Sequence, residues 1–106
     1  MSEEHINQNY QISDTLWEQI EPLLPPELPR LRGGRPRMDN RKAMEAIFYV
    51  FRNGCEWKSV PRSLGTGSTV YRRFQEWQES GLFQRMWRAG LLTYDELEKT
   101  VWYGKG

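Results

Sequence analysis

The sequence is poor in residues that form disulfides or bind metals. Its 106 residues contain one cysteine, Cys55, and one histidine, His5. A single cysteine cannot form a disulfide within the chain, and one cysteine with one histidine cannot supply a conventional zinc site. Cys55 lies near apolar residues with no histidine close in sequence, so we expect it to pack rather than to act as a nucleophile.

Long hydrophobic runs, internal repeats and low-complexity segments are also absent from the sequence. No apolar stretch approaches the roughly 20 residues that cross a bilayer, and the polar start Ser2-Glu3-Glu4-His5 does not resemble a signal peptide. We therefore expect a cytoplasmic protein that does not engage a membrane. With 38% hydrophobic residues and five tryptophans, the chain can form the core of one small domain.

Positive charge is missing from residues 1–29, which carry six acidic residues and no lysine or arginine. Residues 30–90 instead hold 13 Lys/Arg and five Asp/Glu, a net charge of +8, and residues 91–106 have a net charge of −1. The total of +1 hides this asymmetry. The basic middle predicts a polyanionic partner. The acidic leader keeps the chain soluble or shields the basic surface.

A long apolar helix is predicted from its N-cap, Asp39, to Asn53-Gly54. One of its faces carries Ala43, Ile47, Val50 and Phe51, and Met44, Phe48 and Tyr49 widen the apolar stripe. We expect this helix to be the central scaffold of an all-α, trihelical domain. Trp57 is expected to plug the end of that core.

Two further elements follow the central helix. Residues 58–64 predict a short helix with Ser59 as its N-cap, and Gly65 is suited to the left-handed conformation that ends many helices. A longer helix is then expected to begin with Ser68 or Thr69 as its cap. A short helix, a glycine turn and a longer helix are typical of the helix-turn-helix, whose second helix enters the major groove of DNA.

The longer helix, which is predicted to end at Ser80-Gly81, has two different faces. At 100° per residue, Phe74 and Trp77 fall within about 40° of Val70. The opposite half carries Ser68, Thr69, Arg72, Gln75 and Glu76. Hydroxyl, amide and guanidinium groups on an outward face are those that read base edges in the major groove. An ordinary solvated surface helix would show the same two faces.

We predict that Arg72 contacts a base and that Thr69 and Gln75 assist it. Phosphate contacts are predicted for Arg62, Ser68 and Arg73. No residue pattern predicts a metal site or a cofactor.

The segment Arg30-Leu31-Arg32-Gly33-Gly34-Arg35-Pro36-Arg37 is predicted to be an extended basic arm, because its glycines and proline disfavour a helix. Arginines on an extended backbone suit the minor groove, where we expect Arg32, Arg35 and Arg37 to bind. Gly34-Arg35-Pro36 is a partial match to an AT-hook. A flexible basic linker is the alternative.

The two ends of the chain each predict additional helix. Ser13 is a candidate N-cap before Trp17 and Ile20, and Pro25-Pro26 ends that element. An amphipathic helix is expected at Leu82–Arg88, and Tyr94–Lys99 predicts a further turn. The predicted organisation is a leader at 1–29, an arm at 30–38, a helix-turn-helix core at 39–90 and a tail at 91–106.

Several short motifs occur in a familiar order. They are Leu16-Trp17-Glu18, Leu23-Leu24-Pro25, Gly33-Gly34-Arg35-Pro36-Arg37, Gly54-Cys55-Glu56-Trp57, Val60-Pro61 and Ser68-Thr69-Val70-Tyr71-Arg72-Arg73-Phe74. In the order and spacing of these motifs, the chain resembles the N-terminal region of bacterial DDE-type insertion-sequence transposases of the insertion-sequence-five-like group. The resemblance covers about residues 13–98. The resemblance implies a helical domain that binds the terminal inverted repeats of the element. In that family, a separate RNase-H-like domain cuts DNA with three acidic residues and divalent metal.

After Glu98 the sequence departs from this pattern and stops at Gly106 without a catalytic strand. We therefore expect no enzymatic activity. A first reading frame, a truncated remnant and a regulator all remain open. The expected partner is double-stranded DNA. One alternative is an interaction module that uses Trp17, Trp87 and the terminal segments to form a homodimer or a heterodimer with a full-length transposase. Another is a free-standing transcriptional repressor.

Overall fold

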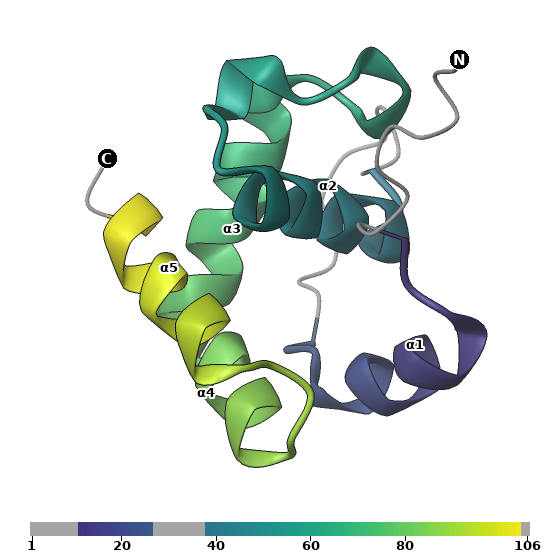
Figure 1. Cartoon of the computed structure of the whole chain (residues 1–106). Coiled ribbons are helices and arrows are strands. Elements are labelled where there is room, and N and C mark those ends of the chain that lie inside the picture. The colour runs from purple at the N-terminus through teal and green to yellow at the C-terminus, as the bar shows by residue number, and fades with distance from the viewer. Residues whose placement is uncertain (1–10, 27–37, 105–106) are drawn as a thin grey trace, which may run out of the picture.

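A computed structural model describes residues 11–26 and 38–104, which form helices joined by short loops (Figure 1). The α-helices are α1 (Asp14–Ile20), α2 (Asn40–Asn53), α3 (Gly67–Ser80), α4 (Leu82–Arg88) and α5 (Tyr94–Gly104). The 3-10 turns are η2 (Glu21–Leu23), η3 (Trp57–Ser59) and η4 (Arg62–Leu64). The predicted all-α class is confirmed for this part of the chain. None of its helices is long and apolar enough to cross a membrane.

Helix α2 has the boundaries that the sequence predicts. It begins after Asp39, whose carboxylate accepts a hydrogen bond from the backbone N–H of Lys42 at 3.1 Å. It ends at Gly54, which adopts the left-handed conformation with φ 62°. Its buried side chains are Ala43, Met44, Ala46, Ile47, Phe48, Val50 and Phe51. Helix α2 therefore contributes to the core along most of its length.

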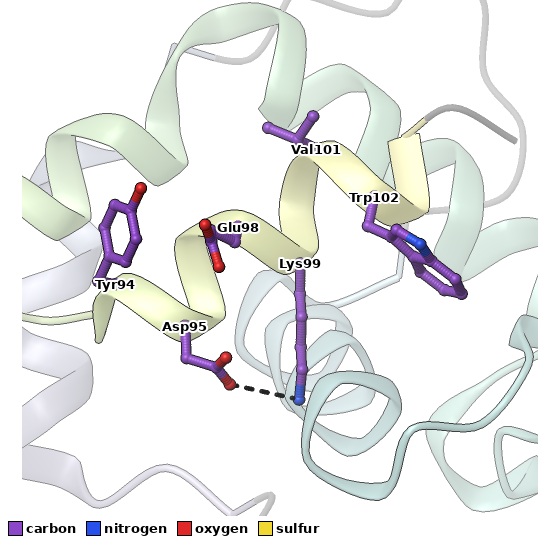
Figure 2. A pocket seen from close by; sticks show the side chains of 6 residues that line it. All are labelled: Tyr94, Asp95, Glu98, Lys99, Val101 and Trp102. Atoms are coloured by element: carbon purple, nitrogen blue, oxygen red, sulfur yellow. Dashed lines mark ion pairs between the residues drawn. The ribbon is translucent and has the colours of Figure 1, made fainter.

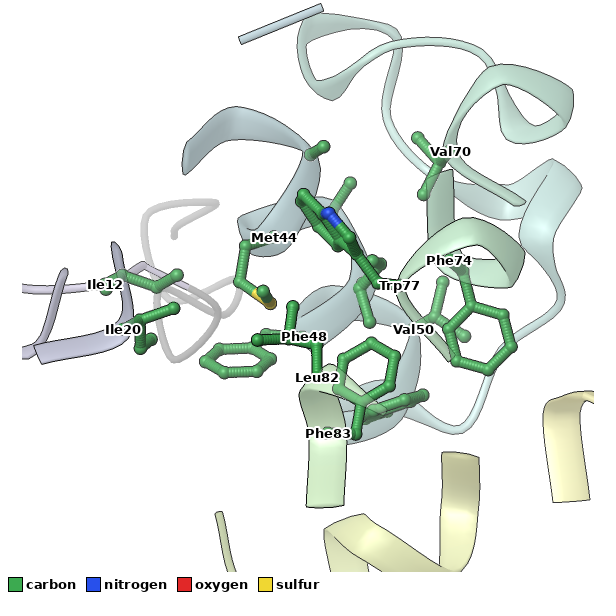
Figure 3. Packing of buried hydrophobic residues seen from close by; sticks show 14 of the residues in the cluster. Ile12, Ile20, Met44, Phe48, Val50, Val70, Phe74, Trp77, Leu82 and Phe83 are labelled. Carbon is green, nitrogen blue, oxygen red and sulfur yellow. The ribbon is translucent and has the colours of Figure 1, made fainter. Parts of the chain in front are cut away.

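Aromatic rings fill the core between α2, α3 and α4 (Figure 3). The Phe51 and Phe74 rings meet edge to face, with their centroids 6.1 Å apart, and the Phe74 and Phe83 centroids are 5.5 Å apart. The Trp57 ring packs 5.0 Å from that of Phe74, at the edge of the core as predicted. Cys55 is half-buried against the same core. Burial raises the pKa of its thiol, with the nearby Glu56 charge contributing, which agrees with a packing role.

The leader helix α1 is docked onto α2 by both apolar and polar contacts. Ser13 caps it by accepting a hydrogen bond from the backbone N–H of Leu16 at 3.1 Å. Ile12 and Ile20 are buried in the same core cluster as Met44 of α2 (Figure 3). Arg41 of α2 donates a hydrogen bond to the Ile12 carbonyl and forms an ion pair with Asp14. Residues 12–20 of the leader therefore belong to the folded unit.

The segment before α3 differs from its prediction. Two 3-10 turns, η3 and η4, replace the single short helix, and they are separated by extended backbone at Val60 and Pro61 with ψ 132° and 144°. The cause is Pro61, which lacks a backbone N–H and disfavours the helical conformation at the residue before it. Gly65 has a positive φ of 111° with ψ −178°, so it lies outside the predicted left-handed helical region.

The N-cap of α3 is Thr66, and the prediction of Ser68 or Thr69 was wrong. The Thr66 hydroxyl oxygen accepts a hydrogen bond from the backbone N–H of Thr69 at 3.3 Å. Helix α3 therefore begins at Gly67 and ends, as predicted, at Ser80 before the left-handed Gly81. Because the cap lies upstream, Ser68 and Thr69 stand within the first helical turn.

Helix α5 extends beyond the predicted turn at 94–99 because it packs on the core. The Lys99 ammonium donates a hydrogen bond to the Phe51 carbonyl at the end of α2, with a distance of 2.6 Å. The Gln78 amide of α3 donates to the Thr100 carbonyl at 2.6 Å. The Tyr103 ring stacks on that of Phe51, with their centroids 5.7 Å apart. Figure 1 shows α5 lying along α3 and α4.

Candidate nucleic-acid interface

Helix α3 presents a row of exposed polar side chains, which we call the α3 row: Ser68, Thr69, Arg72 and Gln75. The opposite side of the helix is buried through Val70, Phe74 and Trp77. Burial of these three residues fixes which face of α3 points outward. Ser68, Thr69 and Arg72 lie on the N-terminal half of α3, the part that contacts bases in known recognition helices, and Gln75 follows near the middle of the helix.

Most members of the α3 row have no competing partner. The side chains of Ser68, Arg72 and Gln75 form no hydrogen bond or ion pair with any residue in the described ranges 11–26 and 38–104. Their donors and acceptors are available to a ligand without first breaking an internal contact. An available guanidinium can donate two parallel hydrogen bonds to a guanine edge or to a phosphate.

Thr69 is held by the cap of its own helix. The Thr66 hydroxyl donates a hydrogen bond to the Thr69 hydroxyl oxygen at 2.9 Å, while the Thr66 oxygen accepts from the Thr69 backbone. Thr69 therefore uses its oxygen as an acceptor toward Thr66, and its own hydroxyl proton remains to be donated outward. The cap orients one member of the α3 row.

A hollow of about 700 Å³ lies between the two 3-10 turns and the start of α3. Its lining residues are Trp57, Lys58, Val60, Arg62, Gly65, Thr66, Gly67, Ser68 and Tyr71. The backbones of η3 and α3 approach closely here, because a Cβ placed on Gly67 would lie 2.5 Å from the Trp57 carbonyl oxygen. This approach positions the cationic side chains of Lys58 and Arg62 beside the first turn of α3.

Lys58 is a candidate that the sequence argument missed. Its side chain is 84% exposed and lies 3.4 Å from a carboxylate oxygen of Glu56, which is itself 72% exposed. Exposed pairs of this kind contribute little, so the ammonium can leave Glu56 for a phosphate. The available signal was a lysine at the start of the short element that precedes the predicted recognition helix. Arg62, which was predicted as a phosphate contact, lies on the same hollow and is exposed.

Arg73 corrects one predicted contact. The sequence placed it with the phosphate-binding residues, but the structure buries it to 4% exposure. Its guanidinium donates hydrogen bonds to the Met38 carbonyl at 2.7 Å and to the Asn40 side-chain oxygen. It also lies 4.8 Å from the centroid of the Trp77 ring. One helical step of about 100° from Arg72 turns Arg73 from solvent into the core, so it does not reach a phosphate.

The arginines of the described chain fall into two groups. Arg41, Arg52, Arg73 and Arg85 bind other parts of the protein. Arg62, Arg72 and Arg88 have no partner among the residues that the structure describes. Of these three, Arg62 borders the hollow and Arg72 lies on the α3 row. The predicted minor-groove residues Arg32, Arg35 and Arg37 lie outside the described residues.

Acidic side chains limit the extent of this surface. Glu76 and Glu79 are exposed on the C-terminal half of α3, where a polyanion would be repelled. The candidate interface is therefore confined to the α3 row and the rim of the hollow. No group of three or more His, Cys, Asp or Glu side chains that could hold a metal ion occurs in the ranges 11–26 and 38–104.

Fold and surface together define a small all-α domain with one exposed polar helix face beside a basic hollow. The family profile described as "Putative transposase of IS4/5 family" matches residues 12–87. The chain belongs to this family. The resemblance inferred from its motifs is therefore confirmed.

Two curated relatives cover the same share of the chain. The insertion element IS402 uncharacterized 16.2 kDa protein of Burkholderia cepacia is 42% identical over 79 residues, which are 71% of this chain and 54% of that protein. The uncharacterized protein y4sN of Sinorhizobium fredii is 33% identical over 75 residues, 71% of this chain and 58% of that protein. The matched part thus spans little more than half the length of these relatives. No solved structure matches the chain.

Proposed function

We propose that this chain binds double-stranded DNA in a sequence-specific manner, at the terminal inverted repeats of an insertion element. The observation that carries the proposal is the α3 row. It combines hydroxyl, amide and guanidinium groups on a helix face that burial of the opposite face directs outward, and the side chains of Ser68, Arg72 and Gln75 have no partner among the described residues. These groups match the donors and acceptors displayed in the major groove.

In the proposed complex, the N-terminal half of α3 lies in the major groove. Arg72 contacts a base edge there, and Thr69 and Gln75 support it. Ser68, Arg62 and Lys58 bind phosphates along the rim of the hollow. Glu76 and Glu79 keep the far end of α3 away from the DNA backbone. The predicted arm at 30–37 adds minor-groove contacts through Arg32, Arg35 and Arg37.

Membership of a transposase family supports the choice of target. One relative is named as an uncharacterized protein of the insertion element IS402, and the ends of such an element are the DNA that its transposase would have to recognise. The domain would supply recognition of those ends, and cutting would be the task of a catalytic domain in a full-length protein. A DNA-binding role needs no metal ion or cofactor.

The experiment that tests this function is a salt titration of DNA binding. Fluorescence anisotropy would follow the full chain on a duplex carrying the inverted repeat of its own element and on a scrambled duplex of equal length. We expect tighter binding to the repeat, and a log–log slope with salt of about −0.9 for each phosphate contacted. Equal affinity for both duplexes would contradict specific recognition, and a flat slope would contradict DNA binding altogether.

A second candidate function is association with another copy of this domain, either in an identical chain or in a longer transposase. Four large apolar side chains are exposed near the C-terminal end: Trp87 at 41%, Tyr94 at 62%, Val101 at 56% and Trp102 at 70%. Figure 2 shows the last three on α5, where they line one pocket together with Asp95, Glu98 and Lys99. Clustered exposed aromatics favour a protein contact. Trp17, the other tryptophan predicted for such a contact, is half-buried against the core.

Sedimentation equilibrium of the DNA-free chain tests this second function. We expect self-association that is weakened by Trp102→Glu and unchanged by Gln75→Ala, which alters the α3 row instead of α5. A monomer at all concentrations, or a dimer insensitive to Trp102→Glu, would contradict association through α5.

A further inference from the structure

We propose that Arg73 is a positioning residue for the interface: it holds α3 in one orientation against the start of α2, so that DNA specificity depends on an arginine that does not touch DNA. The predicted effect of Arg73 on DNA specificity rests on the proposed DNA-binding function. Its structural part stands on the contacts of Arg73 alone.

The guanidinium of Arg73 connects segments that are far apart in sequence. Its two hydrogen-bond acceptors, the Met38 carbonyl and the Asn40 side chain, lie 35 and 33 positions earlier. They flank Asp39, the N-cap of α2. The middle of α3 is therefore fastened to the beginning of α2 at the point where α2 itself is fixed by its cap.

Met38 forms a second connection to α3 through its side chain. A Cβ placed on Gly65, in the turn that leads into α3, would lie 2.7 Å from the Met38 terminal methyl. The Met38 backbone is thus bound by Arg73, and its side chain is packed against the turn. Met38 therefore contacts both Arg73, in the middle of α3, and Gly65, in the turn just before α3.

The geometry of this contact requires arginine. The planar guanidinium donates to two separate acceptors and stacks on the Trp77 ring at the same time. Lysine has a compact ammonium without a flat face, so it cannot meet both acceptors and stack. Arg72, one residue earlier, is exposed and has no described partner. In this proposal the two neighbouring arginines have different roles: Arg72 contacts DNA, and Arg73 orients the helix face that carries Arg72.

DNA binding by Arg73→Met and Arg73→Lys tests the functional consequence, at a temperature at which each variant is folded by circular dichroism. We expect preference for the inverted-repeat duplex over the scrambled duplex to fall by about tenfold, or about 1.4 kcal/mol. Affinity for the scrambled duplex and its salt slope should not change, because the buried charge neutralises no phosphate. Arg72→Lys is the matched control and should reduce preference without lowering the melting temperature.

A salt slope reduced in magnitude by about 0.9 in Arg73→Met would show a direct phosphate contact and overturn the proposal. An unchanged preference in the folded variants would reduce Arg73 to a stabilising residue and also overturn it. A melting temperature that falls while preference stays constant is the signature of that structural role.

A DNA-free measurement separates failure of this proposal from failure of the proposed function. In a Cys55→Ser background, spin labels at Lys42 and Gln75 report the distance between α2 and α3, and labels at Gln75 and Glu98 report α3 against α5. Arg73→Met should broaden the first distance distribution and leave the second unchanged. If the first stays narrow, Arg73 does not position α3, whatever the DNA result. If the wild-type chain shows no preference among duplexes, the DNA-binding function fails while the label distances still decide the positioning role.

Discussion

Arg72 is the side chain on which the proposed recognition depends most. It is exposed on α3 with no partner among the described residues. We predict that Arg72→Ala lowers the affinity for the inverted repeat by about 1–3 kcal/mol and relaxes preference, because a bidentate contact to a base would be lost. Competition binding with repeat variants, changed one base pair at a time, would measure the loss.

Arg88→Ala provides the control for that prediction, since Arg88 is another exposed arginine without a described partner and lies on α4 instead of α3. It removes the same charge and should leave base preference intact. If both substitutions reduce discrimination equally, the effect is one of net charge and Arg72 does not read a base.

Arg72 and Arg73 show how far the exposure of single side chains on α3 could be predicted from the sequence. The α3 row could be predicted because Val70, Phe74 and Trp77 determine which face is buried. The contact predicted for Arg73 gave more weight to its charge than to its position, because at 100° per residue Arg73 lies only about 60° from Val70, beside the buried stripe. Its burial depends on acceptors at Met38 and Asn40, and those residues come close only in the folded molecule.

The contact between η3 and α3 is the element-scale feature that shapes the hollow. Glycine to alanine within a helix normally stabilises it by about 1 kcal/mol. We predict the opposite sign for Gly67→Ala, with a loss of about 1–3 kcal/mol. The new Cβ would lie 2.5 Å from the Trp57 carbonyl oxygen, and that backbone would have to move. Urea unfolding would measure the change.

Ser68→Ala is the neighbouring control for Gly67→Ala, because Ser68 is exposed and has no described partner. It should change stability by no more than a few tenths of a kcal/mol. A stabilised Gly67→Ala variant would mean that η3 does not pack on α3 as closely as described.

Elements with chemical signals at both ends were the ones that the sequence predicted well. Helix α2 has the Asp39 cap and Gly54, and both of its boundaries were predicted correctly. The segment after Trp57 was predicted less well, because Pro61 is acceptable in a first helical turn and equally suited to the extended backbone that it adopts. Helix α5 was underestimated because its stability comes from Lys99, Thr100 and Tyr103 contacting distant residues.

For the whole molecule, we predict binding without cleavage. Cutting and joining DNA through metal ions requires carboxylates gathered around them, and the described ranges contain no such group. We expect that the purified 106-residue chain does not nick its inverted-repeat duplex in Mg²⁺ or Mn²⁺, because the function proposed for it is recognition of DNA, with cutting assigned to a catalytic domain of a full-length protein. A supercoiled-plasmid nicking assay would detect activity, with a catalytically active relative as the positive control. Cleavage that persists through purification and is lost on mutation of an acidic residue would contradict this.

Helix α5 bears on how this protein and its relatives can be recombined. The match to the family profile ends at residue 87, yet Tyr103 stacks on the Phe51 ring and Lys99 donates a hydrogen bond to the Phe51 carbonyl in the last turn of α2. The segment matched by the family profile, residues 12–87, therefore does not include α5, which covers part of the core. A chimera that exchanges only residues 12–87 would join one protein's α2 to another protein's covering helix. Transferring the proposed DNA specificity to another protein would therefore require the segment through residue 104 to be moved together with residues 12–87.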